Sequence, residues 1–157
     1  MSIEKVRAYF RPLGREQDIL EFPVSSATVE LAAQAVGVIP ARIAKTLSFL
    51  VEDHCVLIVT AGDTKVDNSK YKALFHTKAK MLSSEQVSEF TGHAIGGVCP
   101  FGNPSGVRTY LDISMQRFET VFPAAGSSNS AIELTCDELA RYSNSLGWID
   151  VCKGWQV

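Results

Sequence analysis

A glycine-rich stretch in the second half of the chain has the composition of a loop that binds an oxygen ligand through its main chain. It reads Gly96-Gly97-Val98-Cys99-Pro100-Phe101-Gly102. Glycine lets the backbone approach a ligand closely and adopt positive φ, and proline then fixes the chain direction. Successive amide groups in such a loop can bind a carbonyl oxygen, a carboxylate or a phosphate. The same pattern also occurs in simple tight turns, and the phosphate-loop motif GxxxxGK[ST] is absent.

Two charged residues stand where predicted elements meet. Lys45 is predicted on a short helix that begins near Pro40, at the point where that helix runs into a predicted strand, with apolar residues on both sides. Such a lysine can point into a cleft and bind an anionic or carbonyl group, or it can keep only its ammonium in water at the surface. Asp112 directly follows a predicted strand. An acid at that point either serves a site or caps the following turn.

Lysines concentrate between residues 65 and 80, where five of them accompany a single acid, although the whole chain has a net charge of −2. An RNA-facing edge on an acidic protein would have this charge distribution, and so would an ordinary solvated helix face. We assign Lys65, Lys70 and Lys72 to the candidate RNA surface. The acidic balance of the chain does not favour indiscriminate nucleic-acid binding, and no DNA partner is expected.

The four cysteines form no CxxC pair and no histidine cluster accompanies them, so a structural zinc site is not expected. We expect no cofactor. We interpret them as free thiols in a reducing cytosol. Cys99 follows His93 by six residues. This pair could act as a thiol nucleophile with its base, or Cys99 could be a small packing residue beside the glycines.

The chain has 157 residues, of which 46% are hydrophobic and 20% charged. These values predict one compact domain over residues 1–157. The free thiols indicate that this domain is cytoplasmic. The longest apolar run, residues 55–61, is too short to span a membrane, so no membrane partner is expected.

Periodicity and capping residues predict the elements that must position these groups. Helices are expected over residues 3–13, from 26 or 28 to 37, from 40, over 68–75, over 83–92 and over 135–145. Strands are expected over residues 19–24, 47–51, 55–61, 79–82, 108–111, 119–122, 131–134 and 148–151. Because strands and helices alternate irregularly, the sequence predicts an α+β fold with a central mixed sheet flanked by helices.

Several segments together resemble the YbaK/EbsC family, the prolyl-tRNA-synthetase-associated editing domain. The matching segments are residues 27–33, 41–47, 67–70, 96–102, 110–112, 131–134 and 137–139. The lysine segment Ala41-Arg42-Ile43-Ala44-Lys45-Thr46-Leu47, followed at this spacing by the GxxxP loop from Gly96 to Pro100, is the most specific part of the match. The resemblance extends over about residues 25–140.

The resemblance implies the YbaK fold and hydrolysis of the ester that joins an amino acid to the 3′ end of a tRNA. It implies a catalytic set of Lys45, Gly96 and Pro100, in which the lysine holds the terminal nucleotide or the ester and the loop contacts the aminoacyl group. The residues that we assign to substrate binding are Thr28, Gly97, Val98, Cys99 and Asp112. The family needs no metal, and the implied partners are the tRNA 3′ acceptor end and prolyl-tRNA synthetase.

One departure from the family pattern concerns the amino acid removed. The branch that clears cysteine is expected to have Ser-Ala-Gly where this chain has Ala124-Ala125-Gly126. The leading hypothesis is a freestanding deacylase that edits proline tRNA carrying a small non-cognate amino acid. The alternatives are a non-catalytic tRNA- or synthetase-binding module of the same fold, and a thiol hydrolase that uses Cys99.

Overall fold

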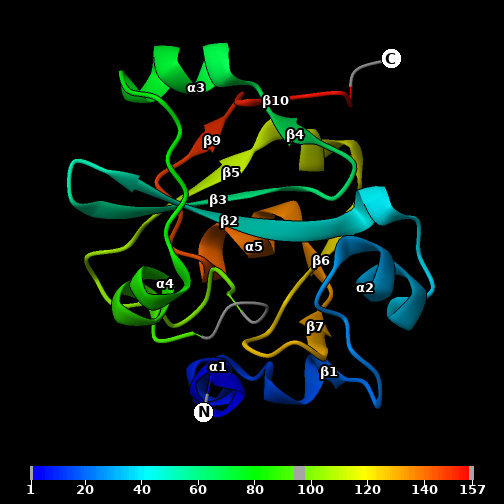
Figure 1. Ribbon diagram of the computed structural model, residues 1–157. Coiled ribbons are helices and arrows are strands. Elements are labelled where there is room, and N and C mark those ends of the chain that lie inside the picture. The colour runs from blue at the N-terminus through cyan, green and yellow to red at the C-terminus, as the bar shows by residue number, and fades with distance from the viewer. Residues whose placement is uncertain (1, 94–97, 156–157) are drawn as a thin grey trace.

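Six strands form one mixed sheet in the computed structural model, which describes residues 2–93 and 98–155 (Figure 1). In order across the sheet they are β8 (Leu134–Thr135), β6 (Thr120–Pro123), β2 (Ile43–Val51), β3 (His54–Ala61), β5 (Arg108–Asp112) and β9 (Trp148–Ile149). Strand β3 pairs antiparallel with β2 and parallel with β5. The predicted α+β fold with a mixed sheet is therefore confirmed.

Two small sheets and five α-helices surround this sheet. The small sheets pair β1 (Ile19–Glu21) with β7 (Ser130–Ile132), and β4 (Lys65–Val66) with β10 (Cys152–Lys153). The helices are α1 (Ser2–Phe10), α2 (Val29–Val36), α3 (Asn68–Phe75), α4 (Ser84–Thr91) and α5 (Cys136–Tyr142). Figure 1 shows α3, β4 and β10 on one side of the sheet and α1, α4 and α5 on the other. No helix in residues 2–93 and 98–155 is long and apolar enough to cross a membrane.

The hairpin of β2 and β3 corrects one part of the sequence prediction. The helix expected from Pro40 is only a 3-10 turn, Pro40–Arg42, and β2 begins at Ile43 rather than at Leu47. The parallel pairing of Ile43 and Ala44 with β6 extends the strand backwards, which local periodicity cannot show. Lys45 therefore lies inside a strand. At the other end, Glu52 and Asp53 both have positive φ, as a two-residue hairpin turn requires.

The helix starts expected from capping residues are confirmed. The Thr28 hydroxyl accepts a hydrogen bond from the Leu31 amide at 3.2 Å and begins α2. Full capping boxes, at Ser83 for α4 and at Thr135 for α5, satisfy the first amide groups of each helix. These caps fix where the helices begin, and hence which residues of the connecting segments face the sheet.

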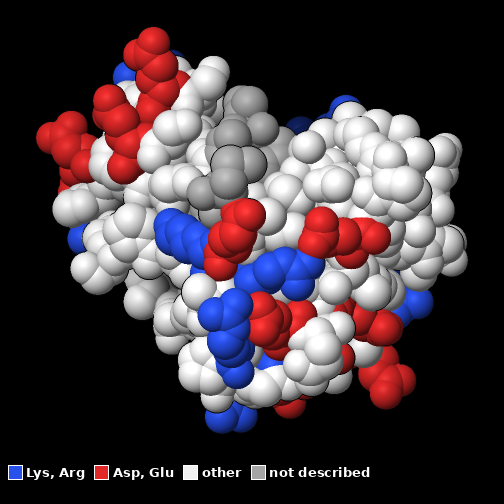
Figure 2. Space-filling view, turned by 90° about the horizontal axis from the view of Figure 1, so that it is seen from below, with Lys and Arg blue, Asp and Glu red and all other residues white. Residues whose placement is uncertain are grey.

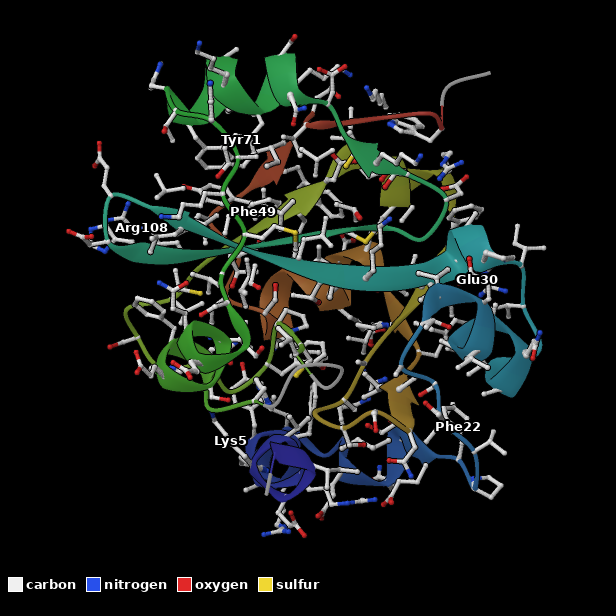
Figure 3. All side chains as sticks on the ribbon, viewed as in Figure 1. Lys5, Phe22, Glu30, Phe49, Tyr71 and Arg108 are labelled. Atoms are coloured by element: carbon white, nitrogen blue, oxygen red, sulfur yellow. The ribbon has the colours of Figure 1, made fainter. Side chains whose placement is uncertain are left out.

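The sheet is buried on both faces. Side chains alternate between the two faces of β2. Phe49 and Val51 point toward α3. The side chains on the other face, which α4 covers, are Ala44, Thr46, Ser48 and Leu50. Figure 3 labels Phe49 and Tyr71, whose rings lie 5.1 Å apart between the sheet and α3. On the other face, α1 contributes Val6 and Phe10 to the largest core cluster.

Candidate functional site

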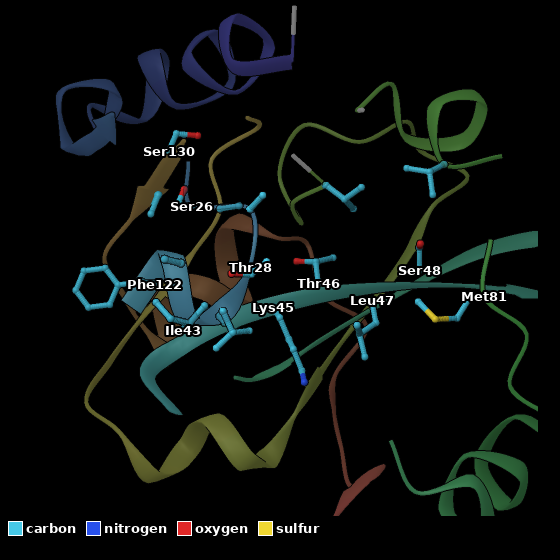
Figure 4. Close-up of a pocket in the computed structure, with 18 of the residues that line it drawn as sticks. Ser26, Thr28, Ile43, Lys45, Thr46, Leu47, Ser48, Met81, Phe122 and Ser130 are labelled. Atoms are coloured by element: carbon cyan, nitrogen blue, oxygen red, sulfur yellow. The ribbon is translucent and has the colours of Figure 1, made fainter. Parts of the chain in front are cut away.

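A pocket of about 330 Å³ lies against β2 and is bordered by residues from α2, α4, β6 and β7 (Figure 4). Strand β2 pairs with β6 at Ile43 and Ala44. Farther along, the Ser48 carbonyl accepts a hydrogen bond from the Leu82 amide at 3.1 Å. Between these contacts, residues 45–47 form an open strand edge in the part of the chain that the structure describes. The pocket is located at this opening.

The pocket wall is mainly apolar, with hydroxyl groups at a few points. The apolar side chains include Val29, Ala32, Ile43, Ala44, Leu82, Val87, Val98, Phe122, Ala124 and Ala131, and the hydroxyl groups belong to Ser26, Thr28, Thr46, Ser48 and Ser130. None of the described lining residues is a histidine, cysteine, aspartate or glutamate. Such a wall suits a small, uncharged group rather than a charged one.

Thr46 presents its polar groups at the open edge. Its hydroxyl is shielded from solvent and has no hydrogen-bond partner among the described residues. Ser48 and Leu50 direct their main-chain groups toward residues 80–82, and alternate residues of a strand hydrogen-bond on the same side. The amide and carbonyl of Thr46 are therefore directed toward the gap in the edge. Thr46 could not be predicted as a pocket residue from the sequence, because the predicted strand began at residue 47 and left Thr46 outside it.

Lys45 also borders the pocket, but its side chain leaves β2 on the face opposite Thr46 (Figure 4). Its ammonium donates a hydrogen bond to the carbonyl of Thr64, just before β4. Partial burial lowers the pKa of Lys45, and the Asp63 carboxylate acts in the opposite direction. An ammonium held by one neutral carbonyl remains available to an anionic or carbonyl ligand.

The glycine-rich loop reaches the pocket through Val98, which lines it. Gly96 and Gly97 lie outside the described residues, so the expected convergence of their amide groups with Lys45 stays a prediction. Cys99 and Pro100 are both buried and do not line the pocket in its described part.

Asp112 and Thr28 differ in how they relate to the pocket. Asp112 is fully buried at the end of β5, and its carboxylate accepts hydrogen bonds from the amides of Ser114 and Val151, both at 2.9 Å. These contacts are those of a turn cap, and Asp112 is not among the described lining residues, so its expected role in substrate binding stays a prediction. Thr28 lines the pocket and also caps α2.

Cys99 and His93 are close together in space, with 3.6 Å between the Sγ atom and Nε2. Both side chains are fully buried. Burial raises the pKa of the Cys99 thiol to about 12 and lowers the pKa of His93, so both groups are held in their neutral forms. A thiol nucleophile needs a thiolate and access to its substrate, and this pair has neither at neutral pH.

The lysines assigned to RNA binding lie on the α3 side of the sheet. Lys70 is already engaged, because its ammonium donates to Asp150 at 2.9 Å and to the Cys152 carbonyl at 3.1 Å. Lys72 on α3 and Lys65 on β4 are exposed, and neither has an ion pair within the described residues. Figure 2 shows the opposite side of the molecule, where α1 lies and where acidic and basic side chains are intermixed.

A family model for the aminoacyl-tRNA editing domain matches residues 24–142. Among curated proteins, an uncharacterised protein of Bacillus subtilis strain 168, YwhH, is 57% identical over 99% of this chain and 100% of its own length. A proline–tRNA ligase of Bacillus licheniformis is 25% identical over 81% of this chain but only 22% of the ligase.

A solved structure of similar fold has been described as a proposed trans-editing enzyme for prolyl-tRNA synthetase. It has a TM-score of 0.87 and 30% sequence identity, and the match covers 98% of both chains. The editing domain that the family model describes therefore occupies most of this chain, with the pocket residues from Ser26 to Ala131 inside the matched region.

Proposed function

Because the chain belongs to the aminoacyl-tRNA editing domain family, we propose that it is a deacylase acting in trans. The reaction is hydrolysis of the ester between a wrongly attached amino acid and the 3′-terminal ribose of a tRNA. The observation that carries this proposal is the pocket at the open edge of β2, where the shielded Thr46 hydroxyl, which has no partner among the described residues, faces a mainly apolar wall.

The pocket suits the aminoacyl group of such a substrate. A volume of about 330 Å³ accommodates a small side chain with the adjoining ester, and the apolar wall favours side chains without charge. Thr46 would hydrogen-bond the ester at the open edge. Lys45, on the other face of the same strand, would bind the terminal nucleotide.

Ester hydrolysis in this pocket would rely on positioning rather than on an acid–base side chain. Water attacks the carbonyl carbon, the C–O bond to the ribose breaks, and the ribose oxygen leaves as a hydroxyl. The attacking water loses one proton, and the leaving oxygen gains one. Since the described lining residues include no carboxylate or imidazole, the 2′-hydroxyl or amino group of the substrate would relay this proton. Amide groups of the glycine-rich loop would stabilise the oxyanion.

We further propose that the substrate is proline tRNA carrying a small non-cognate amino acid. Two findings support this specificity: the similarity to part of a proline–tRNA ligase, and the fold shared with a proposed trans-editing enzyme for prolyl-tRNA synthetase. Prolyl-tRNA synthetase, which would produce the mischarged tRNA, is then the expected functional partner. A cytoplasmic location, where the protein would meet both, is part of the same proposal.

The test is a deacylation panel. Proline tRNA would be charged separately with alanine, cysteine, serine, threonine and proline, and ester loss would be followed with and without the protein. We expect faster hydrolysis of at least one small non-cognate amino acid and no effect on prolyl-tRNA. If every ester decays at its spontaneous rate while the protein still binds the tRNA, the chain is instead a non-catalytic binding module. The absence of a carboxylate, imidazole or thiol from the described pocket lining is compatible with that second function.

A further inference from the structure

Two lysines that are far apart in the sequence face each other across the small sheet of β4 and β10. The antiparallel register of this sheet places Lys65 directly opposite Lys153, and Val66 opposite Cys152. Cys152 is fully buried, so by alternation its neighbour Lys153 faces outward together with Lys65, and both lysines are exposed. Like charges directly opposite each other destabilise an antiparallel pair.

Three carboxylates near this lysine pair form hydrogen bonds with other groups. Asp63 accepts two hydrogen bonds from the guanidinium of Arg117, and Asp150 pairs with Lys70. Asp67, although near enough to Lys153 for their charges to interact, caps α3 by accepting from the amides of Ser69 and Lys70. In the described residues, neither Lys65 nor Lys153 has an ion pair.

The lysine pair lies next to the proposed site. Strand β4 begins directly after Thr64, whose carbonyl accepts the hydrogen bond from the Lys45 ammonium. The charge of Lys65 is close enough to help lower the pKa of Lys45. Figure 1 shows β4 and β10 on one side of β2, and Figure 4 shows the Lys45 side chain leaving β2 away from Thr46. A ligand that enters the pocket at the edge of β2 could therefore continue past Lys45 to this pair.

We propose that Lys65 and Lys153 together bind a backbone phosphate of the tRNA 3′ end, close to the aminoacylated nucleoside. The proposal rests on the deacylase function, because it assumes that the aminoacyl end occupies the pocket. A phosphate between two ammonium groups replaces their repulsion with two charge-assisted contacts. Lys70 is not part of this phosphate site, because its charge is neutralised by Asp150. Lys153 is part of the site, because the pairing of β10 with β4 places it opposite Lys65.

The binding test uses an uncharged RNA hairpin that ends in the single-stranded 3′ end of proline tRNA. We expect Lys65→Ala/Lys153→Ala to weaken binding about tenfold and to reduce the salt dependence by about 0.7 in log K against log salt, the value for one phosphate on a single strand. The control is Arg108→Ala/Arg141→Ala, which removes the same charge from exposed positions. Figure 3 shows Arg108 at the end of the sheet away from β4 and β10. Equal effects of the two double variants would overturn the proposal.

A stability measurement separates phosphate binding from misfolding. Lys65 stands opposite Lys153, and its charge also acts against that of Lys45, so Lys65→Ala should raise the unfolding midpoint of the free protein by about 1–3 °C while weakening RNA binding. A variant that binds RNA poorly because it is misfolded would instead unfold at a lower temperature. Weaker RNA binding together with a lowered midpoint would contradict the proposal.

Kinetics with two substrates separate this proposal from the deacylase function. The double variant should lose about tenfold in kcat/KM on aminoacyl-tRNA and should keep the wild-type value on aminoacyl-adenosine, which has no phosphate. If wild-type protein hydrolyses neither substrate, the deacylase function fails while the RNA-binding result still tests the lysine pair. If the double variant loses activity on both substrates equally, the pair does not act through a phosphate.

Discussion

Lys45 and Thr46 are consecutive residues of β2, and their side chains leave the strand on opposite faces. The ammonium of Lys45 reaches the carbonyl of Thr64, whereas the hydroxyl of Thr46 faces the pocket without a partner. A substrate at the open strand edge would meet a positive charge on one face and a free hydroxyl on the other. An ester joined to a nucleotide has this division between a charged part and a neutral part.

Replacing Thr46 with valine should reduce activity without reducing stability. The hydroxyl has no hydrogen-bond partner among residues 2–93 and 98–155, so its removal should leave the unfolding midpoint unchanged or slightly higher. Loss of one hydrogen bond to the ester should lower kcat/KM by about fivefold to twentyfold. Deacylation rates and thermal unfolding of Thr46→Val and Thr46→Ser check this prediction. Serine should restore most of the rate, and a valine variant with full activity would exclude Thr46 from the site.

Replacing Lys45 with alanine should affect the charged part of the substrate. Hydrogen bonds to charged groups contribute about 1.5–3 kcal/mol, so kcat/KM on aminoacyl-tRNA should fall by about tenfold to a hundredfold. Arg108→Ala is the control, because Arg108 is an exposed cation outside the lining of this pocket and outside the candidate RNA surface. Steady-state kinetics with circular dichroism as a folding check provide the measurement. A comparable loss in both variants would show a general charge effect instead.

Local signals in the sequence predicted where the helices begin, but they did not predict the strand that carries Lys45 and Thr46. The caps at Thr28, Ser83 and Thr135 could be identified because each depends on residues within one turn. The start of β2 could not be identified, because it depends on parallel pairing with β6, nearly eighty residues away. Once Lys45 is known to lie in a strand, alternation alone identifies Thr46 as the residue on the pocket face.

The pairing of Lys65 with Lys153 could not be predicted from the sequence either, because it depends on the distant pairing of β4 with β10. The lysine cluster in the sequence includes Lys70, which donates a hydrogen bond to Asp150, but it does not include Lys153. For Asp112, the sequence left a site role and a turn cap open. The structure shows the turn cap, and the buried position of Asp112 depends on the packing of the segment after β9, which local composition does not encode.

Cys99 should be dispensable for activity. Its thiol is fully buried, and the pKa of about 12 keeps it protonated at neutral pH. Cys99→Ser should therefore retain at least half of the wild-type deacylation rate, and the wild-type protein should resist inactivation by a thiol-alkylating reagent. Complete loss of activity in a folded Cys99→Ser variant would instead support a thiol hydrolase that uses Cys99.

His93 should make stability depend on pH in the acidic range. Burial lowers its folded-state pKa below the ordinary value of about 6.5, so the unfolded chain takes up the proton more readily. The stability contributed by neutral His93 is complete above about pH 6.5 and is lost as the pH falls toward the folded-state pKa. Urea unfolding at several pH values should show this decline, and His93→Gln should flatten it. An equally steep decline in His93→Gln would assign the effect to other groups.

The pocket wall should set the size of the amino acid that is removed. Val29 lines the pocket from α2, and Val29→Ala would enlarge the cavity by two methyl groups. We expect kcat/KM for larger esters such as valyl-tRNA to rise about fivefold relative to alanyl-tRNA, given about 0.8 kcal/mol for each buried methylene. Val24→Ala is the control, because Val24 is 60% exposed and outside the pocket lining. The relative rates on the two esters provide the measurement, and an unchanged ratio in Val29→Ala would place the aminoacyl group elsewhere.

A crystal structure with a non-hydrolysable alanyl-adenosine, in which an amide replaces the ester, would show directly where the aminoacyl group binds. We expect the alanyl methyl group against the apolar wall, the carbonyl oxygen within about 3.2 Å of a donor of Thr46, and the adenosine toward Lys45. An analogue bound at another surface, with the pocket at the edge of β2 left unoccupied at saturating concentration, would contradict this expectation.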